Sequence, residues 1–466
     1  MSVRRLNFSK STPIQSINPY TNEIIAEFEE WDQSKILDIV HDAEQSQIMW
    51  SRTLFPVRAD LFNNLADILE EDKDHYGLFM TREMGKPITQ AIKEIEKCAW
   101  LCRYYAEEGE KFLQAENFQT DYAESTVHYR PMGVVLGVMP WNFPFWQVFR
   151  FAVPTLMAGN SVLLKHASNV SLCSQEIQKI FEKAGFPECL LNSLIVSSEK
   201  VPFIIEQRPV KAVSLTGSTE AGRAVAAKAG ECLKKSVLEL GGSDPYIVFE
   251  DADVDEAAKL CAQSRLINSG QSCIGAKRFI IQDSVYEHFK QKFIKELQSY
   301  KIGNPQDRET DIGPLARMDL QEKLSQQVEE TLTKGARAAM GGKARDKEKP
   351  FYPITVLEDV ELGMPAYDEE LFGPVATLFK FANEKEAIFL ANDTSYGLGA
   401  AIFTKDYERS MRLAIEKLEV GSCFINDFVK SDPRLPFGGV KSSGYGRELS
   451  PFGIREFTNI KTIVSH

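Results

Sequence analysis

Cys273 is a candidate nucleophile, because it ends the run Asn-Ser-Gly-Gln-Ser-Cys after a predicted helix whose apolar face stops near Leu266 and Ile267. A cysteine attacks only as its thiolate, and an ordinary thiol pKa of about 8.5 leaves a few per cent ionised at neutral pH. A nucleophilic Cys273 therefore requires a nearby base or positive charge. The alternative is that Cys273 is a buried and inert thiol, which is the more common case for a cysteine.

Glu239 is a candidate general base, because it follows the apolar run 236–238 and precedes Gly241 and Gly242. Functional groups of α/β proteins gather at the carboxyl ends of strands, and glycines let the backbone approach a ligand. Apolar neighbours raise the pKa of a carboxylate and suit it to general base catalysis. A solvated loop carboxylate is the alternative for Glu239.

Two further motifs suit the binding of negative charge. Asn142, in the run Pro-Trp-Asn-Phe-Pro at 140–144, offers an amide N–H of the kind that stabilises an oxyanion, although a turn residue is equally compatible. The run Thr-Gly-Ser-Thr-Glu-Ala-Gly at 216–222 links a predicted strand to a predicted helix, which is the context of a phosphate loop. Its two glycines, rather than three, also fit a simple turn.

The elements that position these motifs alternate in type along the chain. Strands are expected at 161–165, 193–196, 212–215, 236–240, 246–249, 278–282 and 400–403, and helices at 171–184, 201–206, 219–229, 254–266 and 285–297. Strands that alternate with helices form parallel sheets through right-handed crossovers. The pattern predicts two packed α/β domains.

The first third of the chain is predicted to be mostly helical. One helix is expected from about 88 to 113, with Cys98 and Cys102 as core thiols rather than a redox pair. The runs 125–129 and 134–138 flank Pro-Met-Gly and predict two strands paired around a turn.

Composition excludes several classes of function. Lys and Arg total 54 against 66 Asp and Glu, and the net charge of −12 disfavours a nucleic acid or an anionic membrane as partner. The first residues, MSVRRLNFSKSTPIQ, lack the apolar stretch of a secretory signal, and no run of about 20 apolar residues predicts a membrane span. Eight cysteines without CxxC spacing indicate no metal site and a reducing, cytoplasmic compartment.

Taken in order, the four motifs resemble those of the aldehyde dehydrogenase superfamily. Further blocks of that family follow at 369–374 (Glu-Glu-Leu-Phe-Gly-Pro), 392–398 (Asn-Asp-Thr-Ser-Tyr-Gly-Leu), 436–441 (Pro-Phe-Gly-Gly-Val-Lys) and 443–448 (Ser-Gly-Tyr-Gly-Arg-Glu). The resemblance extends from about Asn18 to the C-terminus. Within the family, the run 164–167 and the segment 431–460 look most like bacterial succinate-semialdehyde dehydrogenases.

The resemblance implies an aldehyde dehydrogenase-like α/β fold with a Rossmann-like cofactor domain, an α/β catalytic domain and an antiparallel oligomerisation arm. The expected boundaries are 1–118 and 140–240, rejoined by about 431–449, for the cofactor domain, 241–430 for the catalytic domain, and 119–139 and 450–466 for the arm. The arm implies a homodimer or homotetramer.

The implied reaction is the NAD(P)-dependent oxidation of an aldehyde to a carboxylic acid through a cysteine thioester. The relatives that the chain resembles most imply succinate semialdehyde as the substrate and succinate as the product. Cys273 is the implied nucleophile, Glu239 the general base, and Asn142 with the backbone N–H of Cys273 the oxyanion hole. The expected cofactor-binding positions are Trp141, Lys165, Ser168, Gly217, Ser218, Gly222, Leu240, Glu370 and Phe372.

Ser168 predicts use of NADP, at least as well as NAD. NAD-selective relatives usually carry a glutamate three residues after the strand-end lysine, here Lys165, where it repels a 2′-phosphate. A serine removes that repulsion and offers a donor. A serine that merely begins a loop is the alternative.

Arg150 is the expected partner of a substrate carboxylate, with a buried salt bridge as the alternative. It lies eight residues after Asn142 on a predicted helical stretch, so both side chains can share a face. Some relatives carry a second arginine where this chain has Ile267, and Ser431 and Arg434 are the expected substitutes.

Other readings remain in view. Other small aliphatic or aromatic aldehydes are alternative substrates. A CoA-acylating relative typically lacks the base that Glu239 supplies, and a non-catalytic structural protein predicts loss of Cys273 or Glu239. A cysteine hydrolase requires a histidine partner, and none of the six histidines lies in a recognisable hydrolase motif.

Overall fold

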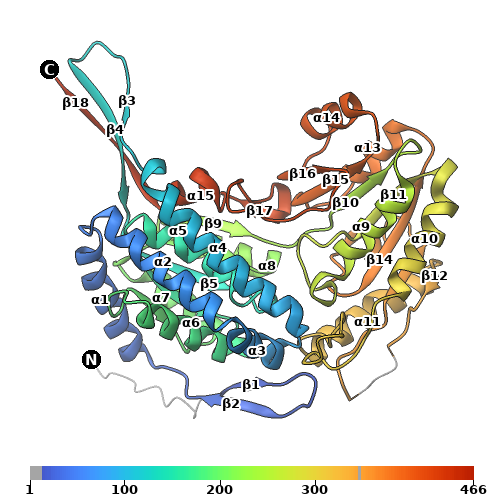
Figure 1. Ribbon diagram of the computed structural model, residues 1–466, viewed down its shortest axis with the longest axis horizontal. Helices are drawn as coiled ribbons and strands as arrows, with labels where there is room; N and C mark the ends of the chain where they lie inside the picture. The colour runs from blue at the N-terminus through green and yellow to red at the C-terminus, as the bar shows by residue number, and fades with distance from the viewer. Residues whose placement is uncertain (1–12, 345–347) are drawn as a thin grey trace, which may run out of the picture.

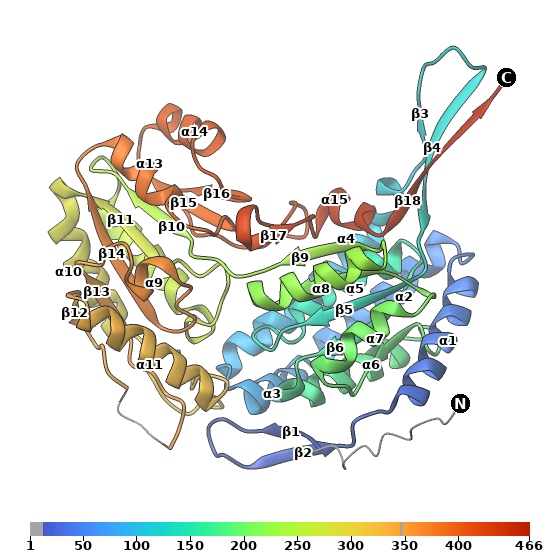
Figure 2. The same ribbon diagram turned by 180° about the vertical axis from the view of Figure 1, so that it is seen from behind.

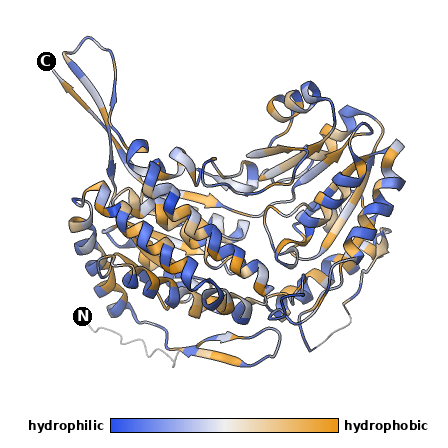
Figure 3. Ribbon diagram, viewed as in Figure 1, coloured by the Kyte–Doolittle hydropathy of each residue, from blue (hydrophilic) through white to orange (hydrophobic). Residues whose placement is uncertain are grey.

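Two α/β bodies lie side by side in the computed structural model, which describes residues 13–344 and 348–466, and a β-ribbon projects from one of them (Figure 1; Figure 2). The α/β class expected from the sequence is confirmed. Many strand segments of both bodies are hydrophobic (Figure 3), as expected of sheets that are covered on both faces. Within the described ranges, no helix is long and apolar enough to cross a membrane.

The first body contains a six-stranded sheet of order β17-β9-β8-β5-β6-β7, in which only the β17–β9 pair is antiparallel. The strands are β5 (Val134–Met139), β6 (Ser161–His166), β7 (Leu191–Ser193), β8 (Val210–Thr216), β9 (Lys235–Glu239) and β17 (Gly444–Tyr445). One face packs against α1 (Gln33–Trp50), α7 (Val201–Glu206) and α8 (Thr219–Glu231). The other face packs against α5 (Trp146–Met157) and α6 (Ser171–Lys183), backed by α2 (Phe55–Glu71), α3 (Lys73–Met84) and α4 (Ile88–Phe112).

The second body contains a seven-stranded sheet of order β12-β13-β14-β11-β10-β15-β16, in which only the β12–β13 pair is antiparallel. The strands are β10 (Pro245–Val248), β11 (Arg278–Gln282), β12 (Arg337–Met340), β13 (Thr355–Glu358), β14 (Val375–Phe381), β15 (Gly399–Phe403) and β16 (Ser422–Ile425). One face packs against α9 (Val254–Leu266) and α10 (Tyr286–Gln298). The other packs against α11 (Met318–Thr333), α12 (Pro365–Asp368), α13 (Glu384–Asn392) and α14 (Tyr407–Glu416).

Most expected elements are confirmed, with ends that differ by one or two residues. The largest difference is β7, which ends at Ser193, where the sequence predicted a strand over 193–196. The hairpin of β1 (Ile14–Ile17) and β2 (Ile24–Phe28) was not predicted. Residues 1–12 of the expected cofactor domain lie outside the described residues.

The projecting ribbon has the order β18-β4-β3 and corrects the expected strand pair. Strand β4 (Glu124–Pro131) pairs with β18 (Thr458–Ser465) and β3 (Glu116–Asn117), whereas β5 pairs in parallel with β6 and β8. The prediction that 134–138 pairs with 125–129 is therefore wrong. Gly133 adopts a φ of 139°, and the chain leaves the ribbon there to enter the centre of the first sheet.

The segment 450–456 also lies outside the ribbon. It forms α15 (Ser450–Glu456), which packs on α4 and α5. The ribbon spans residues 116–131 and 458–465, whereas the arm expected from the sequence spanned 119–139 and 450–466.

The central position of β5 can be tested at Gly137. A Cβ at Gly137 would lie 2.5 Å from Cε1 of the buried Phe151 on α5. We expect Gly137→Ala to lower the free energy of unfolding by about 1–3 kcal/mol through overpacking. Urea unfolding at fixed protein concentration measures this. Gly230→Ala on α8 is the matched control, because nothing lies within 4 Å of its added Cβ, and equal losses in both variants would contradict the packing argument.

Candidate active site

The loop before Cys273 has an unusual backbone that is held by its neighbours. After α9, Asn268, Ser269 and Gly270 all adopt positive φ values of 53°, 56° and 78°. A Cβ at Gly270 would lie 2.3 Å from the backbone of Gly373, so only glycine fits. The buried Arg265 donates a hydrogen bond to the Gly270 carbonyl at 2.5 Å. Such strain persists only where surrounding contacts enforce it.

Two cavities meet at Cys273. The first has a volume of about 510 Å³ and the second about 560 Å³, and both are lined by Cys273 and Gln147. Behind the cysteine, the Lys277 ammonium donates to the carbonyls of Ser272 at 3.0 Å and Cys273 at 2.9 Å. The thiol is therefore fixed where ligands from two directions can contact it.

The Cys273 thiol is neutral in this arrangement. Burial raises its pKa to about 12, Glu370 and Glu239 add to the increase, and Arg150 and Lys277 oppose it. A thiol with this pKa is almost entirely protonated at pH 7. Its activation requires a change in its surroundings, such as the arrival of a ligand or a base.

Asn142 lies against the cysteine loop. Its side-chain Nδ2 donates to the Gln271 carbonyl at 3.1 Å, and Asn268 Nδ2 donates to the Asn142 carbonyl at 2.6 Å. Asn142 also lines the second cavity. The amide that the sequence proposed for an oxyanion hole thus contacts Gln271, which lies two residues before the cysteine that would generate the oxyanion.

Glu239 is buried at the end of β9, and its carboxylate oxygens make no hydrogen bond to any described residue. Burial raises its pKa well above the ordinary value, with opposition from Arg150 and a further increase from Glu448. Its side chain points toward Gly438, where an added Cβ would lie 2.7 Å from Oε1. Glu239 lines neither cavity, so it must move to reach a ligand on Cys273.

Arg150 forms the buried salt bridge that the sequence left as its alternative. Its Nε pairs with Glu448 Oε2, and its guanidinium lies 4.5 Å from the centre of the Phe437 ring. It also lines the first cavity. A contact with substrate therefore remains a proposal for Arg150, in addition to its observed ion pair.

The other two expected substrate residues, Ser431 and Arg434, lie in different environments. Ser431 lines the first cavity and accepts a hydrogen bond from Lys97 Nζ at 2.8 Å. Arg434 lines neither cavity, because its side chain is 65% exposed and pairs with Asp432 at 2.6 Å. The expectation that Arg434 faces the substrate is not met by this geometry.

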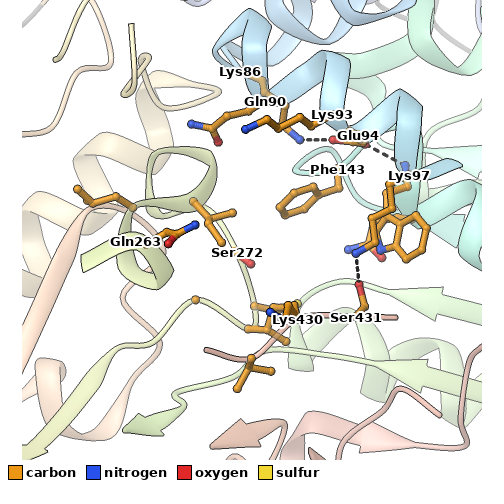
Figure 4. A pocket seen from close by; sticks show the side chains of 18 of the residues that line it. Lys86, Gln90, Lys93, Glu94, Lys97, Phe143, Gln263, Ser272, Lys430 and Ser431 are labelled. Carbon is orange, nitrogen blue, oxygen red and sulfur yellow. Dashed lines mark hydrogen bonds and ion pairs between the residues drawn. The ribbon is translucent and has the colours of Figure 1, made fainter. Parts of the chain in front are cut away.

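Figure 4 shows the cationic wall of the first cavity, which the sequence analysis missed. Lys86, Lys93, Lys97 and Lys430 all line it, together with Glu94. A lysine on a predicted helix is ordinarily read as a solvated residue. The sequence did contain one indication that Lys97 is not fully solvated, because it lies one helical turn from apolar residues of α4.

The second cavity has the features of a nucleotide site. It is lined by Gly217 and Ser218 at the N-terminus of α8, where free N–H groups attract anions. Its other expected lining residues are Trp141, Leu240, Glu370 and Phe372. The Trp141 and Phe372 rings meet edge to face at 5.7 Å.

Three expected cofactor residues do not line that cavity. Gly222 lets α8 pack closely on Leu240, because a Cβ at this position would lie 2.5 Å from the Leu240 side chain. Lys165 is the last residue but one of β6, in register with Val138, and burial lowers its pKa to about 8. Ser168 follows at the same edge of the sheet and accepts a hydrogen bond from the Ser171 hydroxyl. Lys165 and Ser168 therefore lie outside the cavity, and their contact with a cofactor stays a prediction.

Comparisons with known proteins agree with this geometry. Residues 7–463 match the model of the aldehyde dehydrogenase family. The chain is 48% identical over 453 residues to the probable succinate-semialdehyde dehydrogenase (NADP+) of Synechocystis sp., covering 97% of this chain and 99% of the relative. It is 43% identical over 458 residues to the succinate semialdehyde dehydrogenase (NAD(P)+) Sad of Escherichia coli, covering 98% and 99%.

Two solved structures are similar over nearly their whole length. One is that of Gox0499, studied for cofactor and substrate selection, with a TM-score of 0.96, 38% identity, and coverage of 98% of this chain and 100% of that chain. The other is succinic semialdehyde dehydrogenase from Streptococcus pyogenes in complex with NADP+, with a TM-score of 0.94, 38% identity, and coverage of 96% and 99%.

The protonated state of Cys273 predicts its reactivity in the ligand-free protein. Because its pKa is raised to about 12, the thiolate fraction should increase tenfold per pH unit from pH 6 to pH 9 without a plateau. Iodoacetamide labelling, followed by mass spectrometry of the Cys273 peptide, measures this rate. A plateau below pH 8 would show instead that positive charge dominates at this thiol.

Proposed function

Since this chain belongs to the aldehyde dehydrogenase family, we propose that it oxidises succinate semialdehyde to succinate with NADP or NAD. NAD(P)-dependent aldehyde oxidation is the activity of the family. The choice of substrate rests on the two cavities that meet at Cys273. Cationic side chains line the first cavity, which suits an aldehyde with a carboxylate, and the second contains a helix N-terminus that suits a nucleotide. The names of the Synechocystis, Escherichia coli and Streptococcus pyogenes relatives support it.

Each catalytic residue has a proposed step. The Cys273 thiolate adds to the aldehyde carbon, and Asn142 Nδ2 with the Cys273 N–H donates hydrogen bonds to the oxyanion. A bound nicotinamide cofactor would supply the acceptor for the hydride that leaves this adduct, and Cys273 would then hold a thioester. Glu239 then moves from its buried position and removes a proton from water, which hydrolyses the thioester and releases the acid.

The second cavity and the adjoining sheet edge fit the cofactor. The N-terminus of α8, with Ser218 as its cap, suits a pyrophosphate, and Glu370 is fixed by the Gly242 N–H at 3.1 Å and by Lys277 at 3.3 Å. Lys165 and Ser168 present a cation and a hydroxyl at the edge where an adenosine ribose would lie. We infer from this pair that NADP is used at least as well as NAD.

The domain assignment is adjusted to the observed sheets. We infer that the six-stranded sheet and its helices bind the cofactor, that the seven-stranded body supplies Cys273, and that the β18-β4-β3 ribbon joins subunits. The side chains of β18 from Asn459 onward are exposed, with Ile460 at 63%. These exposed apolar groups support a homodimer or homotetramer. The eight free cysteines support a reducing, cytoplasmic location.

Removing the nucleophile or the base should stop different steps. Cys273→Ala should abolish oxidation while the protein still binds cofactor, as measured by fluorescence titration. Glu239→Gln should give a burst of about one reduced cofactor per site followed by near arrest, because only hydrolysis of the thioester is lost. Stopped-flow absorbance at 340 nm measures the burst. Full steady-state turnover in Glu239→Gln would remove that carboxylate from its proposed role.

Ser168 should control cofactor preference. A glutamate at this position would repel the 2′-phosphate of NADP, so Ser168→Glu should shift the ratio of kcat/KM for NADP to that for NAD by roughly 10- to 1,000-fold toward NAD. Ser168→Ala is the matched control, because it removes the hydroxyl without adding charge and should change the ratio far less. An unchanged ratio in Ser168→Glu would contradict the placement of Ser168 at the ribose.

A further inference from the structure

Lys97 has an unusual setting for a lysine. It projects from α4 into the first cavity, where its ammonium donates to the Ser431 hydroxyl at 2.8 Å and lies 4.2 Å from the centre of the Trp146 ring (Figure 4). Both partners are neutral. Burial lowers the pKa of Lys97 to about 8, and Arg150 contributes to the decrease, yet a group with this pKa is mostly charged at pH 7.

Of the other cations that line the cavity, Lys93 is exposed, and three already have anionic partners. Lys86 pairs with Glu94, Arg150 pairs with Glu448, and Lys430 pairs with Asp427 at 2.5 Å. Within residues 13–344 and 348–466, no carboxylate lies within ion-pair distance of Lys97, so its charge is not neutralised by a direct partner.

The two carboxylates whose charges act on Lys97, Glu94 and Asp432, are both engaged elsewhere, Asp432 with Arg434. Glu94 Oε1 accepts from the backbone N–H groups of Phe145 at 3.0 Å and Trp146 at 2.9 Å, while Oε2 faces Lys86. Glu94 is therefore committed to the start of α5 and to Lys86. A bound ligand could therefore supply the anion that Lys97 lacks among the described residues.

A half-buried ammonium with one hydroxyl and one aromatic face as neighbours retains unused donors. An ammonium has three N–H groups, and a charge-assisted bond to a carboxylate is about twice as strong as a neutral one. The Ser431 hydroxyl can accept from Lys97 and donate its own proton to the same anion. Lys97 and Ser431 therefore form a two-donor site for one carboxylate inside the cavity that ends at Cys273.

We propose that Lys97, assisted by Ser431, binds the distal carboxylate of the aldehyde substrate and so makes the enzyme selective for semialdehydes of short dicarboxylic acids. This inference rests on the proposed function, which has the aldehyde carbon at Cys273. It assigns the role of the missing second arginine at Ile267 to a lysine on α4, far from that position in the sequence.

The Lys97→Met variant tests whether Lys97 binds the substrate carboxylate without taking part in the oxidation itself. We expect kcat/KM for succinate semialdehyde to fall roughly 30- to 300-fold, mainly through a higher KM, whereas kcat/KM for butanal should change less than about threefold. Steady-state assays with both aldehydes at saturating cofactor give the two ratios. Lys111→Met is the control for net charge, because Lys111 lies at the far end of α4 and pairs with Glu108 on the surface.

Each outcome decides the matter. Equal losses for the two aldehydes, or no loss for succinate semialdehyde, would overturn the assignment of Lys97. If the methionine variant does not fold, as judged by its melting temperature, Lys97→Gln gives the same test, since it keeps a donor and removes only the charge. A wild-type enzyme that shows no preference for succinate semialdehyde over butanal would instead contradict the proposed function itself.

Discussion

The active site depends on how helix α5 is held at its start and in its first half. At its start, Glu94 accepts hydrogen bonds from the N–H groups of Phe145 and Trp146, and Lys86 neutralises the same carboxylate. Further along, Arg150 is bound by Glu448 from the C-terminal segment. Losing one member of such a buried pair leaves an uncompensated charge, which typically costs about 3–5 kcal/mol. The turn that carries Asn142 and the wall of the substrate cavity are both anchored to this helix.

The same charges set the protonation of the reactive groups. Arg150 lowers the pKa of Cys273 and of Glu239, although burial raises both overall. Glu448 raises the pKa of Glu239. In the ligand-free site the Cys273 thiol is therefore protonated, and burial favours the protonated form of the Glu239 carboxyl as well. The charge of Arg150 is shared between the fold and the chemistry, so its role cannot be reduced to a contact with substrate.

Local patterns in the sequence predicted local features well. Apolar runs and glycine turns placed β6, β8, β9, α8 and α9 within one or two residues, and the order of motifs placed Cys273, Asn142 and the α8 turn around common cavities. Pairing over long distances was less predictable. The turn at Pro131–Gly133 looked like a hairpin, but β5 gains more from burial between β6 and β8 than from pairing with β4. Lys97 escaped notice because only the packed structure shows that its helix face lines a cavity.

The antiparallel strand β17 covers the outer edge of β9, and it is the segment after β17 that brings Glu448 to Arg150. Roughly 300 residues separate Arg150 from Glu448, and synthesis at about 5–20 residues per second takes about 15–60 s to cross that distance. During this time the first sheet lacks its last strand and Arg150 lacks its counter-ion. Completion of the first body must therefore wait until the second has left the ribosome, so the two bodies cannot mature as independent units in the order of their synthesis.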